Sequence, residues 1–170
     1  MNYAQAIQYL YPSAIALADY YCVTLGDGTQ NIVKWNAAKL GPQPTEAQLE
    51  AAWPAAQLQQ AKTTQRALIK SSFIAASTAN VTDRKGIVWE GGVQSGNSIF
   101  LGCQLAQQAG QSTVTLYDAN KTPHSMTIAE GMGVAALIGT AYQEALAKKN
   151  TLYATIDAAN SVSEVQSVTW

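Results

Sequence analysis

The stretch that decides the fold runs from Thr127 to Ala159 and reads TIAEGMGVAALIGTAYQEALAKKNTLYATIDAA. Its first four residues have the pattern of a capping box. The Thr127 hydroxyl can accept a hydrogen bond from the Glu130 backbone N–H, and the Glu130 side chain can accept one from the Thr127 backbone N–H. Mostly apolar or small side chains then recur every three or four residues, the period of one helix face: Val134, Ile138, Ala141, Ala145, Lys149, Leu152, Ile156 and Ala159. The pattern predicts one helix over 128–159, about 48 Å long at about 1.5 Å per residue.

A helix of this length needs a partner along its apolar face. Residues 54–79 are the only other segment long enough to supply one, so we expect the two helices to pack together. The second helix carries a heptad-like seam, with a neighbouring stripe of Ile69, Phe73 and Ala76; the seam consists of Leu58, Ala61, Gln65, Leu68, Ser72, Ala75 and Ala79. Packing within its own domain and self-association into a stalk are both open, and the polar seam members favour the first.

The N-terminal third predicts a small module. A short helix over 3–11 stops at Pro12, and residues 13–18 are Ala-rich without a clear pattern. Two β-branched and aromatic runs, 20–25 and 31–35, flank a Gly-bearing turn and predict a β-hairpin. Thr45 opens a second capping box with Gln48. The helix that follows meets Pro54, which either kinks it or starts a new helix.

The second half predicts another hairpin before the long helix. Residues 112–117 alternate as a strand, and 123–127 return after a turn. We therefore predict an α+β protein with a small N-terminal β-hairpin module, two long packed helices and a second β-hairpin in the C-terminal half. The expected division is 1–53 for the N-terminal module, 54–79 for a connecting helix and 80–170 for a C-terminal α+β domain.

The composition excludes some functions and favours association. The 170 residues carry a formal net charge of −1, and only 12% are charged, about half the usual share of roughly 25%. No basic excess is present to bind nucleic acid by counterion release, and no net charge is high enough to keep the chain disordered. A weakly charged surface with a net charge near zero favours assembly with other chains.

The N-terminus lacks the basic and continuous apolar runs of a signal peptide, and no apolar run is long enough to span a membrane. Cys22 and Cys103 form no CxxC motif, so we expect two reduced thiols. We expect synthesis and folding in a cytoplasm.

No residue pattern points to catalysis, a cofactor or a metal. The glycine-rich stretch 91–98 lacks the lysine of a phosphate-binding loop, and His124, the only histidine, has no nucleophile signature beside it. The carboxylates are scattered, without metal-ligand spacing. A glycosidase-type pair assembled in space stays a remote alternative, with Glu90, Asp118 and Glu130 as the residues to test.

Aromatic residues are the candidates for an interface, because they contribute large contact area at low entropic cost. Tyrosines concentrate near the N-terminus, and tryptophans end three of the expected elements. Packing inside the hairpin module is an equally open interpretation. The candidate interface residues are Tyr3, Tyr9, Tyr11, Trp35, Trp53 and Trp170.

Two parts of the sequence resemble phage proteins. Residues 32–36, IVKWN, followed by 40–53, LGPQPTEAQLEAAW, resemble the short N-terminal module of tail proteins of tailed bacteriophages, in which a strand ending in Trp-Asn leads through a Pro-Thr step into a short helix. The Gly-rich stretch 86–102, the hairpin around Tyr117 and the long helix ending near Trp170 resemble a phage domain of uncharacterised function. In that family the helix that leads into the domain is often rich in arginine, whereas this chain has only Arg66 and Arg84 in the corresponding region.

The resemblance implies a non-enzymatic structural component of the virion tail, associated with the tail fibre or baseplate and bound to a larger fibre protein of the same phage. It implies no catalytic residues. A tail-fibre assembly chaperone, absent from the mature virion, is the alternative, and a polysaccharide-acting enzyme is a remote one. A homo-oligomer is possible, and neither nucleic acid nor membrane insertion is expected.

Overall fold

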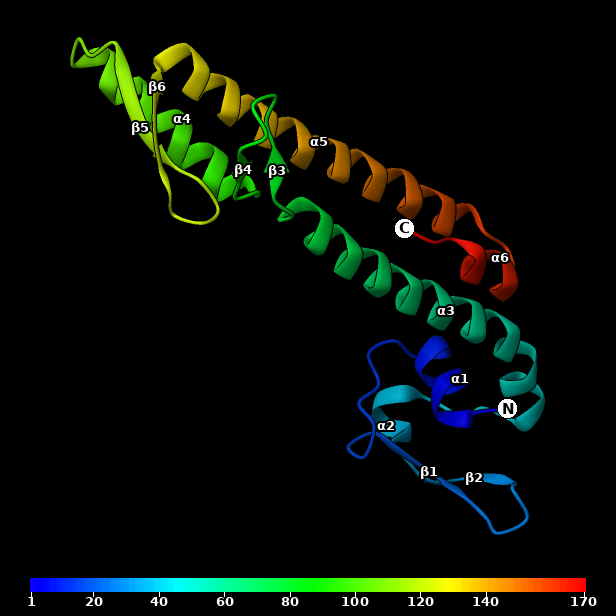
Figure 1. Ribbon diagram of the computed structural model, residues 1–170. Coiled ribbons are helices and arrows are strands. Elements are labelled where there is room, and N and C mark those ends of the chain that lie inside the picture. Colours follow the sequence, from blue (N-terminus) through cyan, green and yellow to red (C-terminus); the bar gives the residue numbers. More distant parts are fainter. The chain divides into compact units, whose positions relative to one another are not determined.

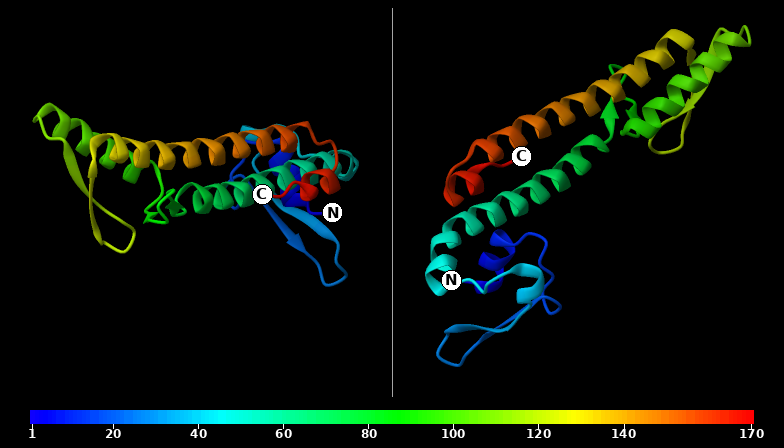
Figure 2. Two further views of the ribbon diagram at one scale, coloured as in Figure 1. Left: turned by 45° about the horizontal axis from the view of Figure 1, so that its top comes forward. Right: turned by 180° about the vertical axis from the view of Figure 1, so that it is seen from behind.

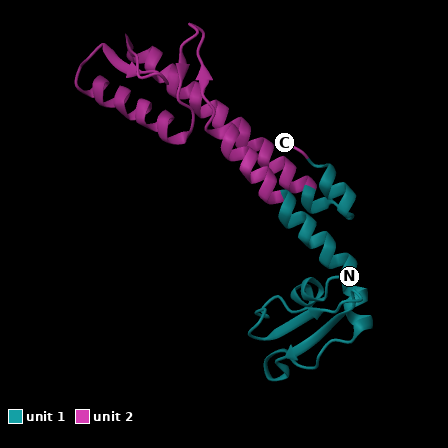
Figure 3. Ribbon diagram, turned by 60° about the horizontal axis from the view of Figure 1, so that its bottom comes forward, with its two compact units in different colours: residues 1–65, 156–168 teal, residues 66–155, 169–170 magenta.

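The computed structural model describes all residues from 1 to 170, and the chain forms two compact units (Figure 3). Unit 1 comprises residues 1–65 and 156–168, and unit 2 comprises 66–155 and 169–170. Two long helices, α3 (Glu46–Ser77) and α5 (Ile128–Ala158), contribute residues to both units (Figure 1). Helices predominate, and the strands form only two-stranded antiparallel hairpins, so the predicted α+β class is confirmed. The division at residues 53 and 79 stays a prediction.

Unit 1 contains the predicted hairpin module. Its elements are α1 (Tyr3–Leu10), β1 (Tyr20–Thr24), β2 (Gln30–Trp35), α2 (Ala37–Leu40), the first part of α3, and α6 (Val162–Ser167). Asn2 caps α1 by accepting from the Gln5 N–H at 3.1 Å. The core residues come from α1, the loop after it, β1 and α3, and are Ala6, Ile7, Ala14, Tyr20 and Leu49. Trp53 packs against this core too, as its i, i+4 spacing from Leu49 predicts.

The capping box at Thr45 is confirmed. The Thr45 hydroxyl accepts from the Gln48 N–H at 3.3 Å, and Gln48 Oε1 accepts from the Thr45 N–H at 2.8 Å. Pro54, however, lies inside α3 and does not begin a new helix. Proline removes only one donor, which leaves the Glu50 carbonyl without its usual helical partner. The packing of Leu49 and Trp53 on one side of Pro54 and of Ala56 on the other holds the helix together.

The two long helices pack as predicted within each unit. In unit 2, the Phe73 and Tyr142 rings meet edge to face at 5.9 Å, and the Tyr153 hydroxyl donates to the Arg66 carbonyl at 3.2 Å. In unit 1, the Lys62 ammonium donates to the Asp157 carbonyl at 2.8 Å. The contact between the segments 54–79 and 128–159 is therefore confirmed.

The buried residues agree with the predicted seam on α5 but only in part with the predicted seam on α3. Every member of the α5 seam is buried or partly buried, and Ile138 and Ile156 are almost fully so. On α3 the predicted seam is wrong in its second half, because Leu68 is 56% exposed and Ala75 is also exposed. The neighbouring stripe of Ile69, Phe73 and Ala76 faces inward instead. Moving a predicted seam by one residue turns it by about 100° around the helix. Small residues such as Ser72 and Ala75 occur on buried and exposed faces alike, so they could not show which face of α3 is buried.

Unit 2 is built around Trp89. Its elements after α3 are β3 (Val81–Thr82), β4 (Val88–Trp89), α4 (Val93–Gln108), β5 (Thr113–Tyr117), β6 (Pro123–Thr127) and most of α5. The predicted second hairpin is confirmed: β5 and β6 pair antiparallel, with Thr113 opposite Thr127. The short β3–β4 hairpin was not predicted. Helix α4 lies beside the first turns of α5 (Figures 1 and 2).

The core of unit 2 holds Trp89 at zero exposure, with Leu116, Met126, Val134 and Ile138. The Trp89 indole N–H donates to Asp83 Oδ2 at 3.0 Å, so its one polar atom is satisfied. None of the helices is both long enough and apolar enough to cross a lipid bilayer.

Candidate interaction surface

The loop from Pro12 to Asp19 joins α1 to β1 and carries the most exposed large apolar side chain of the chain. Leu17 is 68% exposed and Ile15 is 60% exposed. We call residues 12–19 the Leu17 loop. A single exposed aliphatic side chain is common on protein surfaces. The significance of Ile15 and Leu17 therefore depends on how the backbone of the loop is held.

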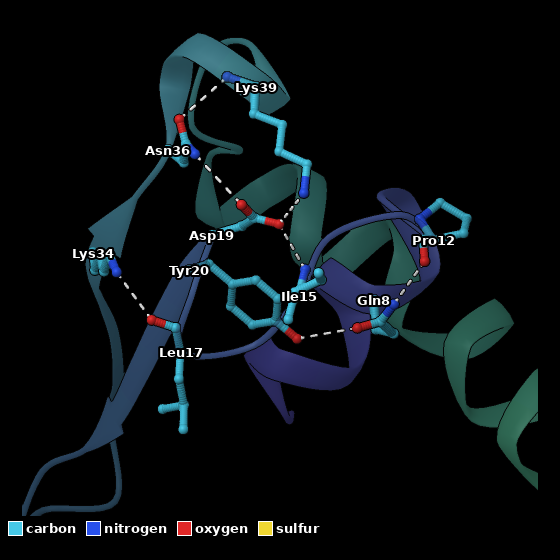
Figure 4. Close-up of polar contacts among 9 residues, drawn as sticks. All are labelled: Gln8, Pro12, Ile15, Leu17, Asp19, Tyr20, Lys34, Asn36 and Lys39. Atoms are coloured by element: carbon cyan, nitrogen blue, oxygen red, sulfur yellow. Dashed lines mark hydrogen bonds and ion pairs between the residues drawn. The ribbon is translucent and has the colours of Figure 1, made fainter.

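Asp19 holds the Leu17 loop through side-chain hydrogen bonds and is itself only 5% exposed (Figure 4). Its Oδ2 accepts from the Ile15 N–H at 2.8 Å and from the Lys39 ammonium at 2.5 Å, and its Oδ1 accepts from the Asn36 amide at 3.4 Å. The Lys39 ammonium, followed by the Ile15 N–H, holds the pKa of Asp19 below its ordinary value. The carboxylate therefore stays ionised, and the bonds that depend on its charge stay strong.

The partners of Asp19 are themselves fixed by the helix that follows β2. Asn36 is the N-cap of α2, and its side-chain oxygen accepts from the Lys39 N–H at 3.2 Å. The Asn36 N–H donates to the Asp19 carbonyl at 2.8 Å. Loop, strand and helix thus share one polar network, and we call Asp19, Asn36 and Lys39 the Asp19 network.

The other side of the loop is tied to α1 and to the hairpin. The Tyr20 hydroxyl donates to Gln8 Oε1 at 3.4 Å, and the Gln8 amide donates to the Pro12 carbonyl at 3.0 Å (Figure 4). The Lys34 ammonium, from β2, donates to the Leu17 carbonyl at 2.9 Å. No carboxylate forms an ion pair with Lys34, so its positive charge is not neutralised within the chain.

Leu17 itself has a left-handed backbone, with φ at 68°. This conformation costs a residue other than glycine about 1–2 kcal/mol. The Leu17 N–H donates to the Tyr20 carbonyl at 2.7 Å, which holds the strained turn closed. Figure 4 shows the side chain pointing away from the Asp19 network. The loop therefore presents an apolar side chain from a rigid and strained support, which is a feature of functional sites.

The six aromatic candidates lie elsewhere, and most of them pack within the chain. Tyr9 is exposed, at 44%. Tyr11 and Trp35 meet edge to face at 5.1 Å, and the Trp35 indole N–H donates to the Gly41 carbonyl at 2.8 Å. Trp53 and Tyr3 pack against the unit 1 core.

Two of these aromatics also have charged neighbours. The Tyr3 hydroxyl donates to Glu46 Oε1 at 2.8 Å, and this bond raises the pKa of Tyr3. Trp170 is partly buried, with the Lys148 ammonium 4.9 Å from its ring centre. An interface role for the six residues stays a prediction. Ile15 and Leu17 were missed because they stand in a stretch whose sequence pattern favours no element.

In unit 2 the carboxylates singled out from the sequence each have a local structural partner. Glu90 pairs with Lys121 at 2.5 Å. Glu130 closes the predicted capping box, accepting from the Thr127 N–H at 2.8 Å, and also pairs with Lys85 at 2.7 Å. The Lys85 ammonium is the first cause, and the Thr127 donors the next, of a Glu130 pKa lowered to about 2.

Asp118 organises the turn of the second hairpin. It accepts from the backbone N–H groups of Asn120 at 2.8 Å and Thr122 at 2.9 Å, and lies 3.1 Å from His124 Nε2. The His124 contact, followed by the Thr122 N–H, lowers the pKa of Asp118. The imidazole also meets the Trp89 ring edge to face at 5.6 Å. His124 is thus built into the packing of the hairpin.

The Glu130 cluster predicts a specific pH dependence of stability. Because the pKa falls from an ordinary 4.5 to about 2 on folding, its contribution is complete above about pH 4.5 and is lost as the pH drops toward 2. We expect the thermal midpoint of the native chain to exceed that of Glu130→Gln by a small constant amount at pH 5 to 7. The difference should shrink as the pH falls below about 4.5 and disappear only below about pH 2.

A suitable control for this experiment is Glu144→Gln, on the same helix. Glu144 is exposed and has no hydrogen bond or ion pair. Its variant should follow the native chain at every pH. A Glu130→Gln difference that stays constant down to pH 2 would contradict the assignment.

Three further features bear on chemistry: possible metal ligands, the two thiols and a pocket in unit 2. No group of three or more His, Cys, Asp or Glu residues is placed to hold a metal ion. Cys22 and Cys103 are free thiols in different units, and burial raises the pKa of both. A pocket of about 570 Å³ lies in unit 2 between the β3–β4 turn and α5, with Arg84, Lys85 and Glu130 at its edge and Val134 and Leu137 in its apolar wall.

Comparison with known proteins found one similarity, in the N-terminal part of the chain. Residues 3–61 match the family described as XkdW protein, a phage-associated family. The match spans the Leu17 loop, the first hairpin and the first turns of α3. It supports a bacteriophage-related protein. Searches of curated proteins and of solved structures gave no match.

Proposed function

We propose that this chain is a non-enzymatic structural component of a phage tail, associated with the fibre or baseplate, and that it docks onto a larger tail protein through the Leu17 loop. One observation carries the proposal. The most exposed large apolar side chain of the protein stands on a rigidly held loop inside the region that matches a phage-associated family.

The Asp19 network, together with the bonds from Lys34 and Gln8, supports a docking role because these contacts remove the entropic cost of ordering the loop. Association is weakened when loops must be fixed at an interface. Here the bonds to Ile15, Leu17 and Pro12 are already made in the free chain. Burial of Leu17 by a partner then adds to affinity without that cost.

The chemistry of the loop also limits what the partner offers. Leu17 and Ile15 require an apolar recess. Lys34, which lies against the Leu17 carbonyl and has no carboxylate partner, favours an acidic side chain beside that recess. The larger tail protein should therefore present a pocket of apolar residues bordered by Asp or Glu.

The state of the carboxylates supports a role without catalysis. A glycosidase needs one carboxylic acid with a raised pKa and a second carboxylate facing the same bond. The pKa values of Asp118 and Glu130 are both lowered, and Glu90 is paired with Lys121. Asp118 stabilises a turn, Glu130 a helix cap and Glu90 a surface ion pair.

The test is the protein composition of purified phage particles. We expect mass spectrometry to find this chain in them, and particles made without its gene to lose a larger fibre or baseplate protein while keeping a normal amount of major capsid protein. A chain that is needed for fibre assembly but absent from finished particles would instead be an assembly chaperone. That result would contradict the proposal.

A further inference from the structure

The pocket beside the β3–β4 turn of unit 2 has the size and the lining of a small-molecule site. Its volume of about 570 Å³ lies within the range of about 300–1,000 Å³ that is common for such sites. Helix α5 contributes Val134, Ala136 and Leu137 to its walls, and β6 contributes Met126. Val134 and Met126 also belong to the unit 2 core. The pocket therefore reaches from the surface down to the apolar core.

The β3–β4 turn, which also lines the pocket, is held in place by Asp83. Its Oδ1 accepts from the backbone N–H groups of Lys85 at 2.8 Å and Ile87 at 3.0 Å. Its Oδ2 accepts from the buried indole of Trp89 at 3.0 Å. These bonds hold the backbone on both sides of Arg84, so the place at which the Arg84 side chain leaves the turn is fixed.

Four charged side chains line the pocket, and three of them already have partners within the chain. Lys85 pairs with Glu130 at 2.7 Å, and both oxygens of Asp83 accept from the N–H groups of the turn and of Trp89. The fourth, Arg84, is exposed and forms no hydrogen bond, ion pair or ring contact. Its positive charge is the one at the pocket that a ligand can neutralise.

A cation without a partner is unusual in this chain. Eight of the ten Lys and Arg residues either bond to an oxygen atom or lie over an aromatic ring. The other two are Arg84 and Lys70, which are both exposed and both in unit 2. Only Arg84 lines the pocket. Lys70 therefore serves as a matched control for any effect of charge alone.

We propose that this pocket binds a small apolar carboxylate, which is a hydrocarbon chain or ring that ends in one carboxylate group. The hydrocarbon part lies against Met126, Val134 and Leu137, where it is removed from water. The carboxylate pairs with Arg84, whose planar guanidinium offers two parallel N–H donors to such a group. A phosphate monoester carries roughly two negative charges at pH 7, so a single free guanidinium suits it less well.

This inference does not depend on the proposed docking function, because it concerns the isolated chain and a different unit. The test is a nuclear magnetic resonance titration of the isotope-labelled full-length protein with three ligands that share one alkyl chain: octanoate, octanol and protonated octylamine. We expect octanoate to bind saturably and to shift the backbone N–H signals of the pocket, those of Arg84 and Gly133 among them.

The three ligands separate the two parts of the proposed contact. The dissociation constant of octanoate should be at least about threefold lower than that of octanol, as a partly exposed ion pair predicts. Octylamine should bind more weakly than octanol, because its charge is repelled by Arg84.

Three variants make the outcome specific. Arg84→Gln should bind octanoate and octanol equally well, since only the ion pair is lost. Lys70→Gln removes the other cation without a partner and should keep the full preference for octanoate. Leu137→Ala should weaken octanoate and octanol alike, by about threefold or more. A native chain that binds no octanoate, that binds it outside this pocket or that does not prefer it to octanol would overturn the proposal, as would an Arg84→Gln variant that keeps the preference.

Discussion

Leu17→Gly should lose most of the affinity for the larger tail protein and yet fold as well as the native chain. The variant removes a side chain that is 68% exposed and whose burial by a partner is worth about 1.5–3 kcal/mol. The dissociation constant should therefore rise about 10- to 150-fold. The measurement is binding of the purified chain to the fibre or baseplate protein of the same phage.

Stability should change little, because two effects of the substitution oppose each other. Glycine relieves the left-handed strain at φ 68°, worth about 1–2 kcal/mol. It also adds freedom to the unfolded chain, worth about 0.5–1 kcal/mol. Stability within about 1 kcal/mol of the native chain, together with lost binding, is the expected pair of results.

The matched control is Leu25→Gly, in the turn of the first hairpin. Leu25 is 45% exposed in the same unit and is not part of the Leu17 loop. Its replacement should leave the affinity unchanged. Equal losses of affinity in the two variants would mean that the Leu17 loop has no special part in docking.

Gly91→Ala should cause the largest loss of stability of any single methyl group added to the chain. An added Cβ would lie 1.9 Å from the Ala79 carbonyl oxygen and 2.8 Å from its carbon. Both atoms belong to the backbone, so the segment that leads from β4 to α4 would have to move. We expect the free energy of unfolding to fall by about 3 kcal/mol, measured by urea denaturation at one protein concentration.

Gly102→Ala is the same chemical change with the opposite expected sign. Gly102 lies inside α4, and nothing stands within 4 Å of its added Cβ. Alanine should stabilise the chain by about 0.5–1 kcal/mol. A Gly91→Ala variant as stable as Gly102→Ala would contradict the close approach of Ala79 to Gly91.

The parts of the fold that could be predicted are those fixed by local chemistry. The capping boxes at Thr45 and Thr127 and the Asp118 turn form from residues a few positions apart. The α5 seam was read correctly because Val134, Ile138 and Ile156 are large enough to mark one face. The seam on α3 was misread from Leu68 onward, because the contacts that Tyr142 and Lys149 of α5 make with Phe73 favour the neighbouring stripe.

The candidate interaction surface could not be predicted in the same way. The left-handed turn at Leu17 opposes the intrinsic preference of leucine, and it depends on Lys34 and Tyr20, which come from the hairpin. Asp19 finds Lys39 only after the chain has turned through β1 and β2. The sequence analysis selected aromatic residues as interface candidates. In the structure, however, Tyr11 and Trp35 pack against each other.

The central claim is that the Leu17 loop contacts a larger protein in the assembled tail, and site-specific cross-linking in intact particles tests it most directly. The variant Leu17→p-benzoylphenylalanine places a photoreactive group on the loop, and Tyr117→p-benzoylphenylalanine places it on a side chain that is 62% exposed in unit 2. On irradiation, we expect position 17 to capture a larger tail protein and position 117 to capture none. Particles that contain the chain but give no cross-link from position 17 would contradict the account.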